Sequence, residues 1–345
     1  MKIKVRDLPL EDVLAIPPEI HLRPRKPGMF FRTLVRAVSE PDLRAVHFSY
    51  TEHGMEKLDP HEPALILMNH SSFIDLKIAY KILYPRPFNI VCTSDGFVGK
   101  RWLMRRLGCI PTRKFMSDIT LVRDMMYTVR KLHSSILMYP EASYSFDGTA
   151  TPLPDSLGQC LKLLRVPVVM IRTFGAFARD PLYNNLQLRH TDVSARVDYL
   201  LSPEDIASRS VAELNAILRE QFTFDNFRWQ QESGVEISEP FRADGLNRVL
   251  YKCPVCGAEG QMKGAGTELS CGACGRRWEL TELGRLRFLD GDAEGVSDTH
   301  ADTHAEAHTD ARAVSAAPVT PVVPVAPKIF DHVPDWYAWE RACVR

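Results

Sequence analysis

The stretch Ala-Leu-Ile-Leu-Met-Asn-His-Ser-Ser-Phe-Ile-Asp, residues 64–75, decides the predicted fold. Its first five residues form a short, unbroken apolar run, which is typical of a strand buried on both faces of a parallel sheet. A polar turn with His70 follows, and a helix to about residue 84 is predicted to begin near Asp75. Ligands of open α/β sheets bind outside the carboxyl ends of the strands, so His70 stands where such a fold places its chemistry.

The same alternation of apolar runs and helical stretches continues towards the carboxyl terminus. Further strands are predicted at 89–93, 109–112, 135–139, 166–175 and, with the alternation of an edge strand, 192–200. Helices are predicted at about 97–107, 117–132, 155–165 and 202–222, the last one capped by Ser202. Strands that alternate with helices predict an α/β fold with a largely parallel sheet flanked by helices.

A short amphipathic helix is predicted before this sheet, from Met29 onward. One face carries Phe30, Phe31, Leu34, Val35 and Val38, and another carries Arg32 and Arg36. Two interpretations stay open for the apolar face. It packs on the core of the domain, or it lies among the headgroups of a membrane surface.

The composition excludes several classes of protein. The chain has 345 residues, 45% of them hydrophobic, which excludes wholesale disorder. Lys and Arg together number 43, as do Asp and Glu, so a globally basic nucleic-acid-binding protein is not expected. The sequence contains no run of 18 apolar residues, and its start, MKIKVRDLPLEDV, lacks the apolar centre of a signal peptide. We therefore expect a cytoplasmic protein without a transmembrane helix.

The net charge of zero hides an uneven distribution. Residues 77–131 contain 12 Lys and Arg against 3 acids, whereas residues 290–310 contain 7 acids and no Lys or Arg. The basic block suits an anionic ligand or an anionic membrane surface. A solvated helix face rich in Lys and Arg is the alternative interpretation.

Two cysteine pairs give the most specific local signal. Cys253-Pro-Val-Cys256 and Cys271-Gly-Ala-Cys274 are separated by 14 residues and are each followed by a glycine. Four thiolates on two tight turns make a closed tetrahedral zinc site, which is structural because it leaves no position for a substrate. Two redox dithiols are the alternative. The partner of this zinc ribbon stays open: another protein, a nucleic acid or the chain's own α/β domain.

His70 and Asp75 form a candidate catalytic pair. A tight turn between strand and helix can bring the carboxylate to one imidazole nitrogen, which leaves the other nitrogen as a general base. A helix-capping Asp beside a structural His is the alternative. A second polar turn, Tyr139-Pro-Glu141-Ala-Ser143, follows another predicted strand and lies at the same edge of the sheet.

Four motifs in order resemble those of the glycerolipid acyltransferase family, whose best-known members acylate lysophosphatidic acid. These are Asn69–Asp75 (NHSSFID), Gly99–Arg113, Tyr139–Ser143 (YPEAS) and Arg165–Ile171 (RVPVVMI). The resemblance covers roughly residues 28–222. It implies an α/β domain preceded by a helical membrane-docking element, and a peripherally membrane-bound enzyme.

The resemblance also implies roles for individual residues. His70 would be the general base and Asp75 its orienting partner, with Arg113 binding an anion and Glu141 positioning the acceptor. The predicted substrate-binding residues are Asn69, Lys100, Arg113, Lys114, Glu141 and Ser143. The acyl donor would be acyl-coenzyme A or an acyl-carrier protein, and the acceptor a lysophospholipid such as 1-acylglycerol-3-phosphate.

One departure from the family bears on the acceptor. The family usually follows Pro-Glu with Gly-Thr-Arg, whose Arg grips the acceptor phosphate, but this chain has Ala142, Ser143 and Tyr144. Either Arg113, Lys114 or Arg172 takes the phosphate, or the acceptor is a lipid alcohol or amine without one. A non-catalytic scaffold that works through its zinc ribbon is a further alternative.

The sequence predicts five segments. They are an N-terminal extension at 1–27, the acyltransferase domain at 28–240, the zinc ribbon at 245–290, a disordered linker at 291–328 and an aromatic terminal helix at 329–345. The linker is rich in Ala, Asp and Thr and then has a proline at every third position, which is typical of an extended spacer. Three tryptophan and tyrosine residues at 336–339 are costly to leave in water, so we expect the terminal helix to pack back on the protein.

Overall fold

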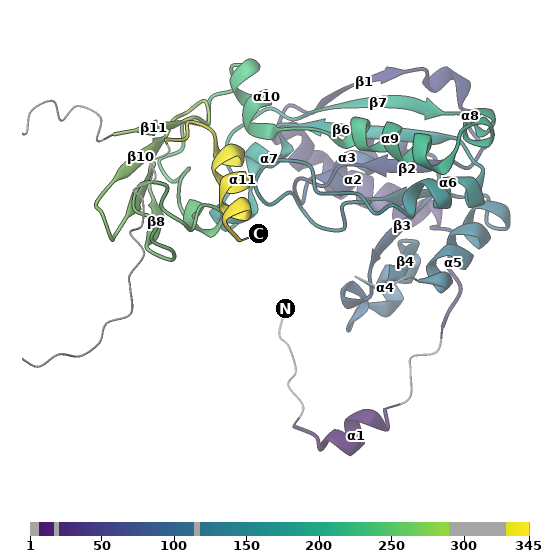
Figure 1. The fold of residues 1–345 in the computed structure, drawn as a ribbon. Helices are drawn as coiled ribbons and strands as arrows, with labels where there is room; N and C mark the ends of the chain where they lie inside the picture. Colours follow the sequence, from purple (N-terminus) through teal and green to yellow (C-terminus); the bar gives the residue numbers. More distant parts are fainter. Residues whose placement is uncertain (1–6, 17–20, 114–117, 290–328, 345) are drawn as a thin grey trace, which may run out of the picture.

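The computed structural model describes residues 7–16, 21–113, 118–289 and 329–344. The predicted linker at 291–328 and the predicted substrate-binding residue Lys114 lie outside this part of the chain. The described residues form a large α/β unit, a small β unit and a terminal helix beside both (Figure 1).

The α/β unit is built on a seven-stranded sheet with the order β1-β7-β6-β2-β5-β3-β4. The strands are β1 (Ser49–His53), β2 (Leu65–Met68), β3 (Phe88–Thr93), β4 (Cys109–Thr112), β5 (Ser135–Met138), β6 (Val168–Phe174) and β7 (Ser194–Leu201). The five strands from β6 to β4 are parallel, β7 runs antiparallel to β6, and β1 is parallel to β7. The predicted fold class, a largely parallel sheet flanked by helices, is confirmed.

Helices cover both faces of this sheet. The helices of the α/β unit are α2 (Met29–Ala45), α3 (Asp75–Leu83), α4 (Arg101–Arg106), α5 (Ile119–Arg130), α6 (Leu157–Leu164), α7 (Ala176–Arg179), α8 (Pro203–Ser208), α9 (Val211–Phe222) and α10 (Asn226–Glu232). Ile66 and Met68 of β2 pack with α3 on one face, whereas Leu65 and Leu67 pack with α5, α6 and α9 on the other. All four side chains are fully buried, which explains the unbroken apolar run.

Two details of the predicted α/β unit are wrong. The strand at 192–200 is not an edge strand, because β1 pairs along its outer side. The helix predicted at 202–222 is two helices, α8 and α9. Ser202 caps α8 as predicted, and Ser210 begins α9 with a second capping box in which it exchanges hydrogen bonds with Glu213.

Helix α2 buries one of its arginines and exposes most of its apolar face. Arg32 is buried, and its guanidinium donates to the Pro85 carbonyl. The apolar side chains of Phe30, Leu34 and Val38 are exposed instead, with Phe30 71% accessible. A guanidinium can be buried here because a backbone carbonyl accepts its hydrogen bond.

The β unit and the terminal helix pack on the α/β unit. The four-stranded antiparallel sheet has the order β11-β10-β9-β8. Its strands are β8 (Met262–Ala265), β9 (Glu268–Cys271), β10 (Arg277–Leu280) and β11 (Leu286–Phe288), and the terminal helix is α11 (Val333–Val344). Trp278 of β10 and Trp336 of α11 share one core with Phe177 and Phe227 of the α/β unit. The predicted domain boundaries stay a prediction, since this core crosses them.

A separate short helix, α1 (Leu10–Leu14), lies in the predicted N-terminal extension and buries none of its side chains. Among the described residues, no helix combines the length and apolar character needed to cross a bilayer.

Candidate active site and metal centre

The carboxyl ends of three neighbouring parallel strands meet at the candidate site. His70 follows β2, Tyr139 and Glu141 follow β5, and Thr173 lies near the end of β6. β2 lies between β5 and β6 in the sheet, so the loops after these strands are adjacent. His70 therefore stands at the centre of the ligand-binding edge of the sheet.

His70 and Asp75 are brought together as the sequence predicts. His70 Nδ1 lies 3.0 Å from Asp75 Oδ2, and the same oxygen accepts the backbone N–H groups of Ser71 at 2.7 Å and Ser72 at 3.0 Å. Asp75 is the first residue of α3 and is fully buried, whereas the His70 side chain is 20% exposed. A carboxylate only accepts, so Nδ1 carries the proton and Nε2 is left with a free lone pair.

Two tyrosine rings enclose the His70 imidazole, and sequence reasoning missed this arrangement. The Tyr139 ring stacks on it at 4.1 Å and the Tyr144 ring lies against it at 4.0 Å, measured between ring centroids. Burial and the nearby Asp75 charge raise the pKa of Tyr144 to about 12 and hold the pKa of Tyr139 well above its usual value. Both phenols therefore stay neutral beside the imidazole.

The carboxylate of Glu141 is engaged inside the protein. Its Oε2 accepts the His70 backbone N–H at 2.9 Å, and its Oε1 accepts the Thr151 N–H at 2.8 Å. Burial raises the pKa of Glu141. The family resemblance assigns this residue to the acceptor, but in this geometry its two oxygens fix the His70 backbone to the loop after β5.

Asn69 joins two strand ends. Its Oδ1 accepts the Thr173 N–H at 2.8 Å, and its Nδ2 donates to the Ser71 hydroxyl at 3.1 Å. Asn69 is buried, so its amide is used to align β2 with β6. The substrate-binding role of Asn69 stays a prediction.

Sequence reasoning also missed an acidic residue that contacts the turn between β2 and α3. The Ser72 hydroxyl donates to Asp180, which pairs with Arg179 at 3.1 Å. Asp180 follows α7 and is buried, and that burial raises its pKa. No motif in the sequence marks Asp180, because it reaches Ser72 only through the path of the chain after β6.

The predicted basic residues that the structure describes are exposed or contact groups other than His70. Lys100 is exposed at the start of α4, and Arg113 follows β4, where its Nε lies 3.6 Å from Asp118. Three strand spacings of about 4.8 Å separate β4 from β2, which places Arg113 roughly 14 Å along the sheet edge. Arg172 donates to the Gln221 carbonyl and is engaged there. Ser143 is exposed in the loop after β5.

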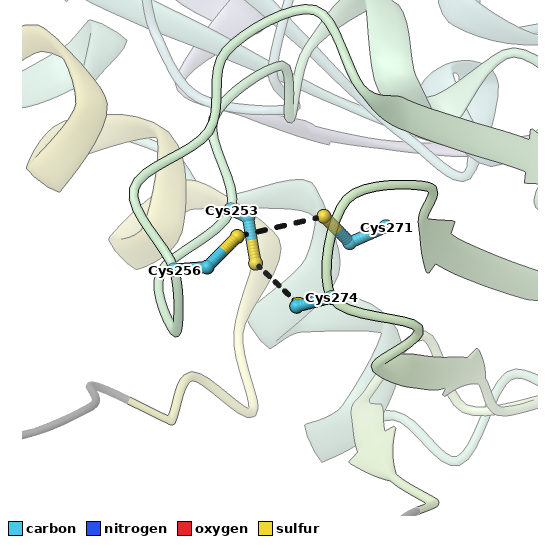
Figure 2. A group of neighbouring side chains, drawn as sticks. All are labelled: Cys253, Cys256, Cys271 and Cys274. Atoms are coloured by element: carbon cyan, nitrogen blue, oxygen red, sulfur yellow. Dashed lines mark hydrogen bonds between the residues drawn. The ribbon is translucent and has the colours of Figure 1, made fainter. Parts of the chain in front are cut away.

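The four predicted zinc ligands converge at the base of the β unit. Cys253 and Cys256 come from one turn, and Cys271 and Cys274 come from the turn after β9 (Figure 2). The Cys253 and Cys274 sulfurs are 3.7 Å apart, the Cys256 and Cys271 sulfurs are 3.8 Å apart, and all four lie within 4.8 Å of one another. A tetrahedron with Zn–S bonds of about 2.3 Å has edges of about 3.8 Å, so the four sulfurs fit a zinc ion.

The backbone of the two cysteine turns also suits a zinc site. The N–H of Gly257 donates to the Cys253 carbonyl at 2.9 Å, and the N–H of Gly275 donates to the Cys271 carbonyl at 2.9 Å. Both glycines have a positive φ, of 73° and 74°, which closes each turn around its sulfurs. A zinc ion held by four thiolates would cross-link the two turns.

Comparisons with known proteins give a matching family and a similar solved structure. Residues 49–172 match the family model described as Acyltransferase. No curated protein matches the chain. Among solved structures, the crystal structure of the 1-acyl-sn-glycerophosphate (LPA) acyltransferase PlsC from Thermotoga maritima is similar, with 14% sequence identity and a TM-score of 0.45. That match covers 55% of this chain and 76% of the Thermotoga chain.

The matched segment contains His70, Asp75 and Glu141 and extends from β1 into β6. The resemblance to an acyltransferase domain noted in the sequence is therefore confirmed for this segment. The β unit with its four cysteines lies outside the matched segment.

We expect the purified protein to contain one zinc ion per chain, measured by atomic emission. Cys274→Ser removes one thiolate, so it lowers the zinc content and the thermal midpoint of the full-length protein. Cys343→Ser is the matched control, since Cys343 is exposed and outside the cluster. Wild-type protein that contains no zinc, and does not take up zinc added to it, would contradict this assignment.

Proposed function

We propose that this protein transfers a fatty acyl group from a thioester to the hydroxyl of a lysophospholipid, with His70 as the general base. The observation that carries the proposal is the His70–Asp75 contact at a rim where His70 is partly exposed, within an acyltransferase-family segment. The donor is acyl-coenzyme A or acyl-carrier protein. The acceptor is a lipid such as 1-acylglycerol-3-phosphate.

The chemistry needs one base and no covalent enzyme intermediate. His70 Nε2 takes the proton of the acceptor hydroxyl while its oxygen attacks the thioester carbonyl. The carbon–sulfur bond then breaks, and the imidazolium returns the proton to the leaving thiolate. Asp75 stabilises the transient imidazolium through Nδ1–H and holds the ring in the required orientation.

Replacing His70 tests this chemistry directly. We expect His70→Ala to lower kcat by about 10² to 10⁴-fold, since general-base catalysis contributes that amount. Asp75→Asn is expected to lower kcat as well, because a neutral amide stabilises the imidazolium less. Turnover is measured as release of free thiol from acyl-coenzyme A in the presence of lysophospholipid.

His61→Ala is the control for the base, since His61 is exposed and outside the site. If His70→Ala released thiol at the wild-type rate, His70 could not be the general base. A wild-type protein that releases no thiol with any lipid alcohol or amine would favour the non-catalytic scaffold instead.

Tyr144 favours a second candidate function, transfer to a lipid alcohol or amine without a phosphate. Tyr144 occupies the position where the family resemblance places a phosphate-binding arginine, and its ring lies against both His70 and Phe73. Tyr139, Tyr144 and Asp75 thus give the His70 ring two aromatic neighbours and one acidic neighbour. This environment suits an apolar acceptor better than a dianionic phosphate.

The acceptor is tested by comparing kcat/KM for 1-acylglycerol-3-phosphate with that for monoacylglycerol. We expect Tyr144→Arg to raise the phosphate-to-neutral ratio about tenfold, because a guanidinium binds phosphate through charge-assisted hydrogen bonds. Tyr144→Phe keeps the ring and should keep the ratio. A Tyr144→Arg ratio equal to that of the wild type would show that this position does not contact the acceptor headgroup.

Peripheral membrane binding is part of the proposal. Phe30, Leu34 and Val38 of α2 are exposed, and so is Trp102 of α4 at 65%. Phe31 links the two helices, since its ring lies 6.1 Å from that of Trp102. We propose that the exposed apolar side chains of the two helices enter the membrane together, with Arg105 and Arg106 in the last turn of α4 adding positive charge.

We expect Phe30→Ser and Trp102→Ser each to weaken binding to vesicles of anionic phospholipid by about tenfold, because each removes an aromatic side chain from the interface. Binding is measured by vesicle sedimentation. Leu188→Ser is the control, since Leu188 is exposed at 62% on another part of the domain. Equal losses in all three variants would argue against a membrane-binding role for α2 and α4.

A further inference from the structure

The terminal helix α11 is anchored to the first cysteine turn. Trp336 is fully buried, and its indole N–H donates to the Lys252 carbonyl at 3.0 Å. The Lys252 N–H donates in turn to Glu340 at 2.8 Å. Lys252 immediately precedes Cys253, so α11 is bound to the backbone that carries a zinc ligand.

The other side of α11 contacts the loop after β5. The Tyr337 ring lies 5.4 Å from the Phe146 ring. His332, just before the helix, pairs with Asp225 at 2.7 Å, and Asp225 forms a β-bridge with Thr149. Both contacts therefore end on the loop at 144–151. Figure 1 shows α11 between the β unit and the α/β unit.

Helix α10 fixes the middle of the same loop. The Gly148 carbonyl accepts both the backbone N–H and the side-chain amide of Asn226, at 2.8 and 2.7 Å. Gly148 has a φ of 88°, and a Cβ there would lie 2.8 Å from the Phe227 ring. The loop therefore packs so closely against α10 that only glycine fits at position 148.

The two ends of this loop reach the catalytic histidine. The Ser145 N–H donates to the His70 carbonyl at 2.8 Å, and Thr151 N–H holds the Glu141 carboxylate that accepts the His70 N–H. Tyr144 supplies one of the two rings that enclose the imidazole. Displacement of the loop would therefore release the backbone of His70 and uncover its ring.

We propose that α11 and the zinc ribbon form a brace that positions the loop at 144–151 against His70, with Tyr337 as its positioning residue. The effect on catalysis rests on the proposed function. The effect on the loop does not, because it depends only on these contacts. The ribbon then serves the chain's own active site, and its metal is coupled to acyl transfer without touching substrate.

Hydrogen exchange of the full-length protein tests the brace without any assay of activity. We expect Tyr337→Ala to speed exchange in peptides covering 144–151 about tenfold, since an aromatic contact that holds the loop is lost. Tyr337→Phe keeps the ring and should keep wild-type protection. Ala338→Ser is the control on the exposed side of α11. Removing zinc with a chelator should also speed exchange in this loop.

Kinetics test the positioning role. We expect Tyr337→Ala to lower kcat about tenfold while zinc content stays at that of the wild type, and Tyr337→Phe to restore kcat. Phe146→Ala removes the same ring contact from the side of the loop. We expect the Phe146→Ala/Tyr337→Ala double variant to lower kcat no more than either single variant does.

Three results would overturn the proposal. Unchanged exchange at 144–151 in Tyr337→Ala or after zinc removal would show that the brace does not hold the loop. Faster exchange with unchanged kcat would show that the loop does not position His70. Losses that multiply in the double variant would show that Phe146 and Tyr337 act separately. A wild-type protein without transferase activity would refute the proposed function. The hydrogen-exchange data would still test whether α11 and the zinc ribbon hold the loop.

Discussion

The hydrogen bond between His70 Nδ1 and Asp75 Oδ2 is the contact on which the site depends. A fully buried carboxylate is costly unless hydrogen bonds replace its water, and two backbone N–H groups in the turn before α3 supply two of them. The imidazole is the third donor, so the fold itself fixes its orientation. The remaining nitrogen is left at the edge of the sheet where α/β proteins bind their ligands.

The loop after β5 builds the rest of the site around this pair. The rings of Tyr139 and Tyr144 lie against the imidazole, and the Glu141 carboxylate accepts the backbone N–H of His70. Arg113 of the basic block follows β4, which is three strands from β2 in the sheet.

The sequence predicts what depends on local pattern. Continuous apolar runs identify the central strands, and the five-residue spacing of His70 and Asp75 across a strand-to-helix turn predicts their contact. Strand β1 has no such pattern, because all five of its side chains are exposed. The ring contacts of Tyr144 with His70 and of Phe146 with Tyr337 depend on the conformation of one loop and on contacts between segments far apart in the chain. No local pattern encodes either.

The most direct measurement of the central claim is the tautomer of His70 in its neutral form, from the nitrogen-15 chemical shifts of the ring at alkaline pH. The account predicts a proton on Nδ1 and a bare Nε2, and a change in this preference in Asp75→Asn. A neutral ring protonated on Nε2 in the wild-type protein would contradict the account, since that nitrogen could not then accept a proton from a lipid hydroxyl.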